Sequence, residues 1–272
     1  MEKKEKIKKQ KPLIKMDDLF KIVKLVLLTG NLIDEKPVSL LIIGKSGIGK
    51  TGLITCFEKD TVACRTDLTY MGLINLIARN NRIKHLIIPD FIKITQKKRA
   101  TSDNFVSLLN AGTEEGLTEF DIGPSHFDLR EMTKEGPKEK HIGIITATTK
   151  ASFGQHKKAW EGFGFVQRML MVTYDYTDET IEEIMQSINR LEYRLASTKE
   201  KIIIKKNFLV NASNDLMKQF NEKLKGNFRG LRQLQTLAMA NALDRGSKFV
   251  EQQDIDEIIR LSKYMNLNFT KI

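Results

Sequence analysis

The sequence predicts an α/β fold in which a parallel sheet carries helices on both faces, with an inserted β-hairpin and an all-helical C-terminal domain. Three observations predict it. Short apolar runs alternate with segments of helical periodicity up to about residue 175. One of these runs leads directly into a glycine-rich loop. Beyond residue 175 the chain carries only amphipathic helical patterns.

The first part of the chain alternates between the two kinds of element. Helices are expected over residues 17–28 and 68–78, and from Ser102 or Asp103 to Glu115, where Gly116 stands in the stop position. Strands are expected over residues 38–43, 61–64, 86–90, 141–148 and 169–172. Such apolar strands, separated by helices, favour a sheet that is covered on both faces.

A hairpin and a run of helices complete the chain. Residues 117–122 and 127–132 alternate in polarity around a Gly-Pro-Ser turn, and residues 133–140 are expected to form a polar, charged turn. Helices are expected over residues 177–195, 214–224, 228–245 and 254–265. We therefore expect a basic, disordered tail (1–15), an α/β core (16–175) and a helical lid domain (176–272).

The glycine-rich loop carries the clearest chemical signal. Residues 44–51 satisfy the pattern G-x-x-x-x-G-K-[ST], between a buried strand and a helix. Backbone N–H groups of such a loop wrap a phosphate, and the helix N-terminus favours its negative charge. Lys50 is expected to reach the β/γ-phosphates of ATP or GTP, and Thr51 to hold Mg²⁺. The expected nucleotide-binding residues are Gly44, Lys45, Ser46, Gly47, Ile48, Gly49, Lys50, Thr51 and Gly52.

Asp90 is the second expected site residue. At the end of a strand beside the phosphate-loop strand, its carboxylate is suited to hold Mg²⁺, although acids are common where strands end. Many nucleotide hydrolases carry Glu at the next position to polarise water, but here the residue is Phe91. Glu114 and Glu115 are possible substitutes, and a solvated helix end explains them more simply.

Threonines and arginines supply weaker candidates. Thr146, Thr148 and Thr149 end the strand over residues 141–148 and are candidates to contact the γ-phosphate. Arg168 precedes the next strand, where it is either a finger for a neighbour's γ-phosphate or an ordinary surface ion pair.

Arg229 and Arg232 share one helix face, because they stand three residues apart. Both are expected to point at the nucleotide from the helical domain, although many arginine-rich helices are only solvated.

Charge and composition restrict the class of protein. The 45 Lys and Arg residues exceed the 34 Asp and Glu residues by 11, which favours a polyanionic partner such as DNA. Residues 1–15 hold seven lysines against Glu2 and Glu5, so the excess in the rest of the chain is 6. Cys56 and Cys64 are expected to be buried free thiols in a reducing cytoplasm. No apolar run approaches the ~18 residues of a membrane span.

The order of these motifs resembles that of an AAA+ ATPase. Residues 44–51 resemble its Walker A motif, residues 86–90 its Walker B motif and residues 144–149 its sensor-1 strand, with the sensor position on Thr149 or Thr148. Residues 226–229 resemble its sensor-2 motif, and an alternative register gives Arg232 that role. The resemblance implies ATP and Mg²⁺ as cofactors, a ring or filament of subunits, and Arg168 acting from the neighbouring subunit.

The segment over residues 109–145 resembles one branch of that family, which contains minichromosome-maintenance helicases and bacterial enhancer-binding activators. The resemblance implies a hairpin that contacts DNA or a protein, with Lys134, Lys138 and Lys140 meeting phosphates or forming a solvated loop. We expect an ATP-driven motor or switch on DNA, such as a helicase, a helicase loader or a viral or mobile-element ATPase. The alternative is a protein-remodelling ATPase. A small-molecule kinase fits the helical C-terminal part less well.

Overall fold

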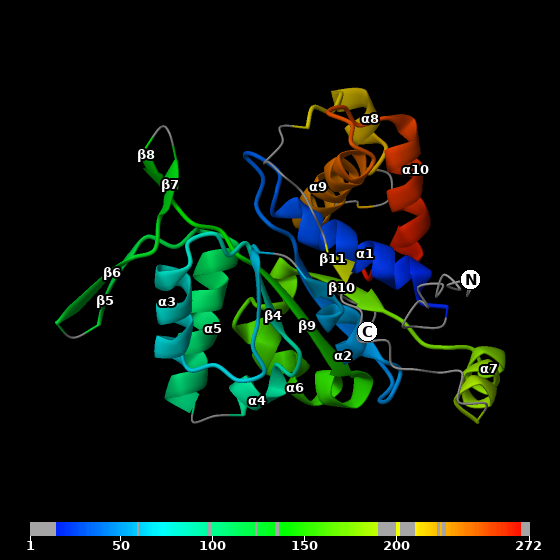
Figure 1. Ribbon diagram of the computed structural model, residues 1–272, viewed down its shortest axis with the longest axis horizontal. Coiled ribbons are helices and arrows are strands. Elements are labelled where there is room, and N and C mark those ends of the chain that lie inside the picture. The colour runs from blue at the N-terminus through cyan, green and yellow to red at the C-terminus, as the bar shows by residue number, and fades with distance from the viewer. Residues whose placement is uncertain are drawn as a thin grey trace, which may run out of the picture.

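A five-stranded parallel sheet organises the computed structural model (Figure 1). The structure describes residues 15–58, 60–96, 99–122, 124–133, 136–189, 200–201, 210–221, 224 and 227–267. The strands follow the order β10-β1-β9-β4-β3. Their bounds are β1 (Ser39–Gly44), β3 (Val62–Cys64), β4 (His85–Ile88), β9 (Gly143–Thr149) and β10 (Met169–Thr173). The predicted α/β class with a parallel sheet is confirmed.

Burial on both faces explains why the central strands are continuously apolar. Leu40 and Ile42 of β1 join one hydrophobic cluster, whereas Leu41 and Ile43 join the other. Successive side chains of a strand point to opposite faces, so each face of β1 contributes two fully buried side chains. At the sheet edge, Cys64 ends β3 and is exposed, and Cys56 is only partly buried, so the expectation that both cysteines are buried is wrong.

Helices cover the two faces of the sheet. The first cluster holds α1 (Asp17–Thr29) and α2 (Lys50–Thr55) against the sheet. The second cluster joins the other face to α3 (Tyr70–Arg79), α5 (Arg99–Thr113) and α6 (Lys150–Gly162). A single turn, α4 (Ile92–Thr95), follows β4.

The C-terminal helices pack on α1 rather than directly on the sheet (Figure 1). They are α8 (Asn214–Lys218), α9 (Phe228–Asp244) and α10 (Gln252–Leu261). Their apolar side chains belong to the same cluster as α1, so one continuous core joins them to the sheet. By contrast, α7 (Asp178–Asn189) stands apart from this core, at the right of Figure 1.

Two antiparallel hairpins project from the segment between α5 and β9. β5 (Glu119–Ile122) pairs with β6 (Ser125–Asp128), and β7 (Glu131–Thr133) pairs with β8 (Gly136–Lys138). The second hairpin occupies the segment expected to be a polar turn. Thr133 pairs with Gly136 at the end of this hairpin, and the Thr133 hydroxyl donates a hydrogen bond to the Gly136 carbonyl oxygen at 2.7 Å. Gly136 has a φ of 115°, in the region that favours glycine. β2 (Phe57–Glu58) pairs in parallel with β11 (Glu200–Lys201), and the two strands form a small sheet of their own.

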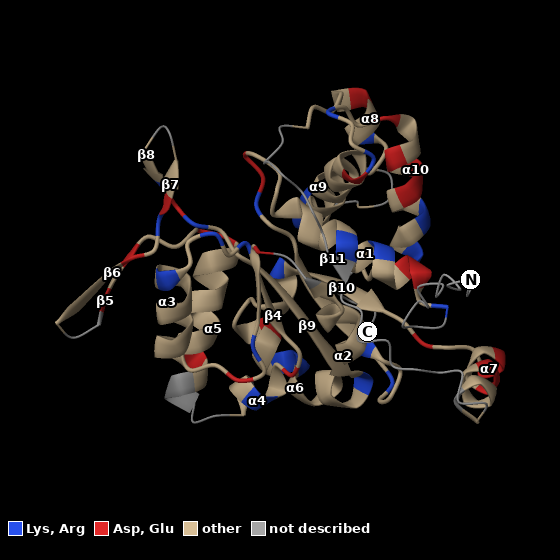
Figure 2. Ribbon diagram, viewed as in Figure 1, with Lys and Arg blue, Asp and Glu red and all other residues tan. Residues whose placement is uncertain are grey.

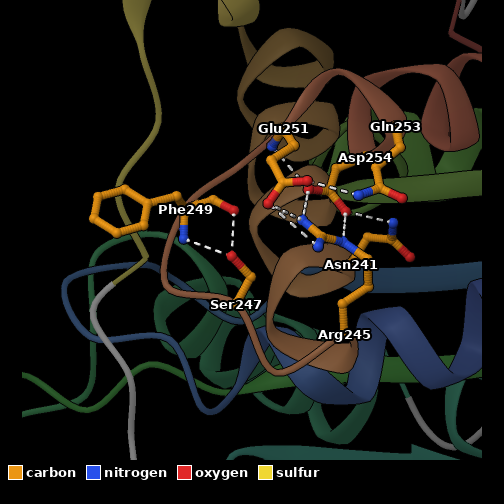
Figure 3. A network of polar contacts seen from close by, with 7 residues as sticks. All are labelled: Asn241, Arg245, Ser247, Phe249, Glu251, Gln253 and Asp254. Atoms are coloured by element: carbon orange, nitrogen blue, oxygen red, sulfur yellow. Dashed lines mark hydrogen bonds and ion pairs between the residues drawn. The ribbon is translucent and has the colours of Figure 1, made fainter.

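A buried carboxylate joins α9 to α10 (Figure 3). Asp254 is fully buried and accepts hydrogen bonds from the Asn241 amide at 2.8 Å and from Nε and Nη2 of Arg245 at 3.0 and 2.7 Å. It also accepts from the backbone N–H of Glu251 at 2.9 Å, which caps α10. Asp254 therefore fixes the start of α10 against the end of α9.

We predict that Asp254→Ala lowers the free energy of unfolding by about 3 kcal/mol, because it removes the buried acceptor that Arg245 pairs with and leaves the buried Asn241 amide without a partner. Denaturant titration measures the change. Asp215→Ala is the matched control, because Asp215 forms an exposed pair with Lys218, and should cost no more than about 0.5 kcal/mol. Equal losses in the two variants would contradict the assigned role of Asp254.

Candidate functional site

The glycine-rich loop joins the end of β1 to the start of α2, at the carboxyl edge of the sheet. Gly47 and Gly49 have φ values of 79° and 81°, in the left-handed region that favours glycine. A Cβ atom at Gly44 would lie 2.4 Å from the carbonyl oxygen of Tyr174, so this position has no room for a side chain. The sequence therefore folds here into a tight strand–loop–helix turn in which residues 45–47 are exposed.

Lys50 lies inside this turn and is almost fully buried. Its ammonium donates to the carbonyl oxygens of Gly44 at 3.0 Å and Lys45 at 2.5 Å. Burial lowers the pKa of Lys50, and the carboxylate of Asp175 opposes that shift only in part. A buried cation that donates to neutral carbonyls gains strongly from an anion placed against it. The loop thus carries a built-in preference for a negatively charged ligand.

Asp175 is a site residue that sequence reasoning missed. It follows β10, the other neighbour of β1, and accepts a hydrogen bond from the backbone N–H of Lys45 at 3.2 Å. Its carboxylate also pairs with Lys150, at the start of α6. Burial raises the pKa of Asp175, but the hydrogen bonds from Lys150 and Lys45 outweigh burial and hold the pKa below its usual value. An acid three residues after the predicted strand 169–172 was the available signal.

Asp90 lies at the same edge of the sheet, but not beside the loop strand. β9 separates β4 from β1, so the expectation that the two strands are neighbours is wrong. Gly44 is paired with Thr149 of β9, and Ile88 with Thr146, which places Asp90 about 10 Å from β1 across the sheet. Its side chain is 45% exposed and pairs with Lys93 at 3.4 Å, so the carboxylate is accessible.

Phe91 explains why no acid follows Asp90. Its ring is buried and stacks on Phe165 at a centroid distance of 4.6 Å, and it meets Trp160 edge-on at 5.5 Å. A carboxylate at this position would have to enter the apolar cluster. Position 91 therefore serves the core, and the structure gives it no access to water.

The proposed substitutes for this acid lie at the wrong edge of the sheet. Glu114 and Glu115 follow α5, where Glu114 pairs with Arg229 at 3.3 Å and Glu115 with Arg168 at 3.5 Å. These contacts place both carboxylates at the amino edge, away from the loop of the same chain. The suggestion that they act on a nucleotide in their own subunit is therefore wrong.

The threonines of β9 divide into two kinds. Thr149 accepts a hydrogen bond from the Ser152 N–H at 3.1 Å and so caps α6, although its register places it beside Gly44. Thr146 and Thr148 are buried, and neither hydroxyl has a hydrogen-bond partner among the described residues. The hydroxyl of Thr149 is therefore committed to α6, whereas those of Thr146 and Thr148 are enclosed without a partner among the described residues.

The three candidate arginines gather around a cavity of about 680 Å³ at the amino edge of the sheet. Its lining includes Arg168, just before β10, and Arg229 and Arg232, in the first turns of α9. Val38 and Ser39, where β1 begins, also line it. The phosphate loop follows the other end of β1, about 16 Å further along the strand.

Arg229 and Arg232 therefore do not point at the loop of their own chain, as was expected of them, because β1 separates the cavity from that loop. Acidic partners hold them instead, Arg229 with Glu114 and Arg232 with Glu35 at 2.8 Å. Burial raises the pKa of Glu35, and Arg232 opposes that shift. Arg168 donates to the carbonyl oxygen of Gly164 at 2.8 Å.

The lysines assigned to the hairpin segment have different surroundings. Lys138 is exposed on β8, and Lys134 lies outside the described residues. Lys140 is fully buried and its ammonium donates to the carbonyl oxygen of Asn81, so its expected role at a phosphate-binding surface is wrong. Burial lowers the pKa of Lys140 to about 8, although Glu131 acts in the opposite direction.

Comparison of the chain with protein-family models and with curated proteins finds no match. Within the described ranges, every helix is too short or too polar to cross a membrane.

We predict that the free energy of unfolding rises with pH above pH 8 because of Lys140. The unfolded lysine keeps its proton up to a pKa near 10.4, whereas the folded one releases it near pH 8. Stability then gains up to about 1.4 kcal/mol per pH unit between these values, and Lys140→Met should lose that gain. Denaturant titrations at pH 7.5, 8.5 and 9.5 measure it, with exposed Lys218→Met as control. Parallel pH profiles for wild type and Lys140→Met would refute the assignment.

Proposed function

We propose that the chain binds a nucleoside triphosphate, ATP in the first instance, at the loop over residues 44–52. The observation that carries this proposal is the buried Lys50 ammonium, which donates to the two neutral carbonyl oxygens of Gly44 and Lys45. Phosphate oxygens placed in the loop would accept hydrogen bonds from Lys50 and from the backbone N–H groups of the exposed residues Ser46 and Gly47, whereas the Lys45 N–H donates to Asp175. The charge on Asp175 and Lys150 is already balanced between them, so Lys50 supplies the cation.

The residues at this edge also fit Mg²⁺. Thr51 is exposed in the first turn of α2, and Asp90 presents an accessible carboxylate from β4. Both supply hard oxygen atoms, and Mg²⁺ in nucleotide sites takes only one or two protein ligands beside phosphate and water. Bound Mg²⁺ would neutralise charge on the phosphates. Thr51 and Asp90 would orient it, and the hydroxyls of Thr146 and Thr148 lie nearby on β9.

The position of the arginines supports a site shared between two copies of the chain. Arg168, Arg229 and Arg232 lie at the edge opposite the loop, where they do not reach a nucleotide of their own subunit. A ring or filament that stacks the amino edge of one copy on the carboxyl edge of the next would bring these arginines to the nucleotide of the neighbouring copy. We assign Arg168 as the finger in this arrangement, which is the interface that an AAA+ resemblance implies.

Turnover is proposed to be slow. The position after Asp90 is filled by the packed ring of Phe91, and the acids Glu114 and Glu115 lie at the opposite edge. The site therefore offers residues that would bind the nucleotide and neutralise the charge on its phosphates, but among the described residues no acid in position to activate water. An ATP-dependent switch fits this balance as well as a motor does.

The net charge of +11 favours nucleic acid as the partner, so we propose an ATPase that acts on DNA in the cytoplasm, as a helicase, a helicase loader or a viral or mobile-element ATPase. One observation favours a protein partner instead. Residues 117–140, which form the hairpins, carry six acids against four bases. One of those bases, Arg130, is held by Asp128 and Glu119.

DNA binding that weakens steeply with salt would support the first candidate. ATP turnover that ignores DNA even at low salt would support the protein-remodelling alternative.

We predict that Lys50→Ala weakens binding of Mg²⁺–ATP by about 10- to 100-fold, because it removes one charge-assisted hydrogen bond to phosphate. Fluorescence titration with a labelled ATP analogue measures the affinity. Lys45→Ala is the matched control, since Lys45 is an exposed lysine of the same loop and contributes through its backbone. Unchanged affinity in Lys50→Ala, in a variant that unfolds like wild type, would refute nucleotide binding at this loop.

Arg168→Ala is expected to keep ATP binding and to lose turnover by a factor on the order of 10³. Mixed with Asp90→Ala protein, it should regain activity, because about a quarter of randomly formed interfaces then hold both residues. Arg79→Ala, on the exposed end of α3, should behave like wild type. If the mixture is no more active than its two components, Arg168 does not act across an interface.

A further inference from the structure

Helix α7 presents an apolar face that the rest of the described chain leaves uncovered. Ile181 and Met185 stand four residues apart on one face of the helix and are 38% and 58% exposed. Figure 1 shows α7 separated from the sheet and from α8–α10. A helix of 12 residues is marginal in water without a packing partner, so this face is suited to docking another segment.

The charge of α7 defines the chemistry of that segment. Four carboxylates lie along the helix, and residues 178–189 contain no lysine or arginine. In Figure 2 the acidic residues of α7 appear as red segments of its ribbon. The carboxylates are those of Asp178, Glu179, Glu182 and Glu183. An apolar stripe beside a purely acidic face fits a segment that alternates lysines with aliphatic residues.

The chain itself brings such a segment to α7. Lys15 places its ammonium 2.6 Å from the carboxylate of Glu183, and its carbonyl accepts a hydrogen bond from the Tyr174 hydroxyl at 2.7 Å. Met16, the next residue, is buried in the core. Lys15 also contributes to lowering the pKa of Glu179, after the Glu179 N–H and the Thr177 hydroxyl. The residues that precede Lys15 therefore start beside the acidic face.

We propose that residues 3–14 of the same chain dock along α7, with their lysines on its carboxylates and their aliphatic side chains against Ile181 and Met185. The segment contains six lysines and the aliphatic residues Ile7, Leu13 and Ile14. Helix α7 is about 18 Å long, and twelve extended residues span about 40 Å, so the segment reaches its full length. Attachment at Lys15 keeps the segment at a millimolar effective concentration.

Amide hydrogen exchange in α7 tests the proposal. We expect amides of α7 to exchange about tenfold more slowly in the full chain than in a variant that lacks residues 2–11, at low salt. The deletion keeps Lys15 and its contact with Glu183, so the difference reports the segment alone. Exchange in α9 should be the same in both proteins, which shows that the deletion variant is folded.

Substitutions separate docking from a general charge effect. Glu179→Gln with Glu182→Gln, and separately Ile181→Ser with Met185→Ser, should each remove most of the protection that the segment gives. The matched control replaces Asp215 and Asp256, exposed acids of α8 and α10, by Asn and should retain it. Protection that rises with protein concentration would overturn docking within one chain in favour of a second copy. Equal exchange in the full chain and the deletion variant would overturn docking on α7 altogether.

Discussion

The parallel direction of the five strands is the constraint on which the arrangement of the site depends. It sends the phosphate-type loop after β1, Asp90 after β4 and Asp175 after β10 to one edge of the sheet. It also sends every residue that precedes a strand to the other edge, and Arg168 is one of these. A single chain therefore holds the glycine-rich loop and the arginine-lined cavity about 16 Å apart, at opposite edges of the sheet.

Local patterns in the sequence predicted the elements of the sheet well, because buried strands need apolar side chains on both faces. The helix α6 was missed, since Phe153 and Trp160 are the only large apolar side chains that anchor it and seven residues separate them. Thr149 was taken as a ligand of the nucleotide, but it also begins α6 as a cap. A threonine at the end of a strand carries both signals, and the sequence does not choose between them.

Spatial order was harder to predict than the elements themselves. Nothing in the strand over residues 141–148 indicates that it lies between β1 and β4. The direction in which Arg229 and Arg232 point depends on how α9 packs on α1, which is set by contacts between residues more than 200 positions apart. The burial of Lys140 has the same origin, because its carbonyl partner belongs to Asn81 in a distant loop. Such long-range contacts leave no local trace.

The ring of Phe91 connects the packing of the core to the chemistry of the site. It lies between Phe165, which precedes the segment bearing Arg168, and Trp160 of α6. Phe91, directly after the accessible carboxylate of Asp90, thus helps to fix the short turn over residues 166–168 that positions Arg168. Replacing that ring by an acid would supply a base only by opening the cluster that holds Arg168 in place. The same packing therefore explains why the residue after Asp90 is aromatic rather than acidic.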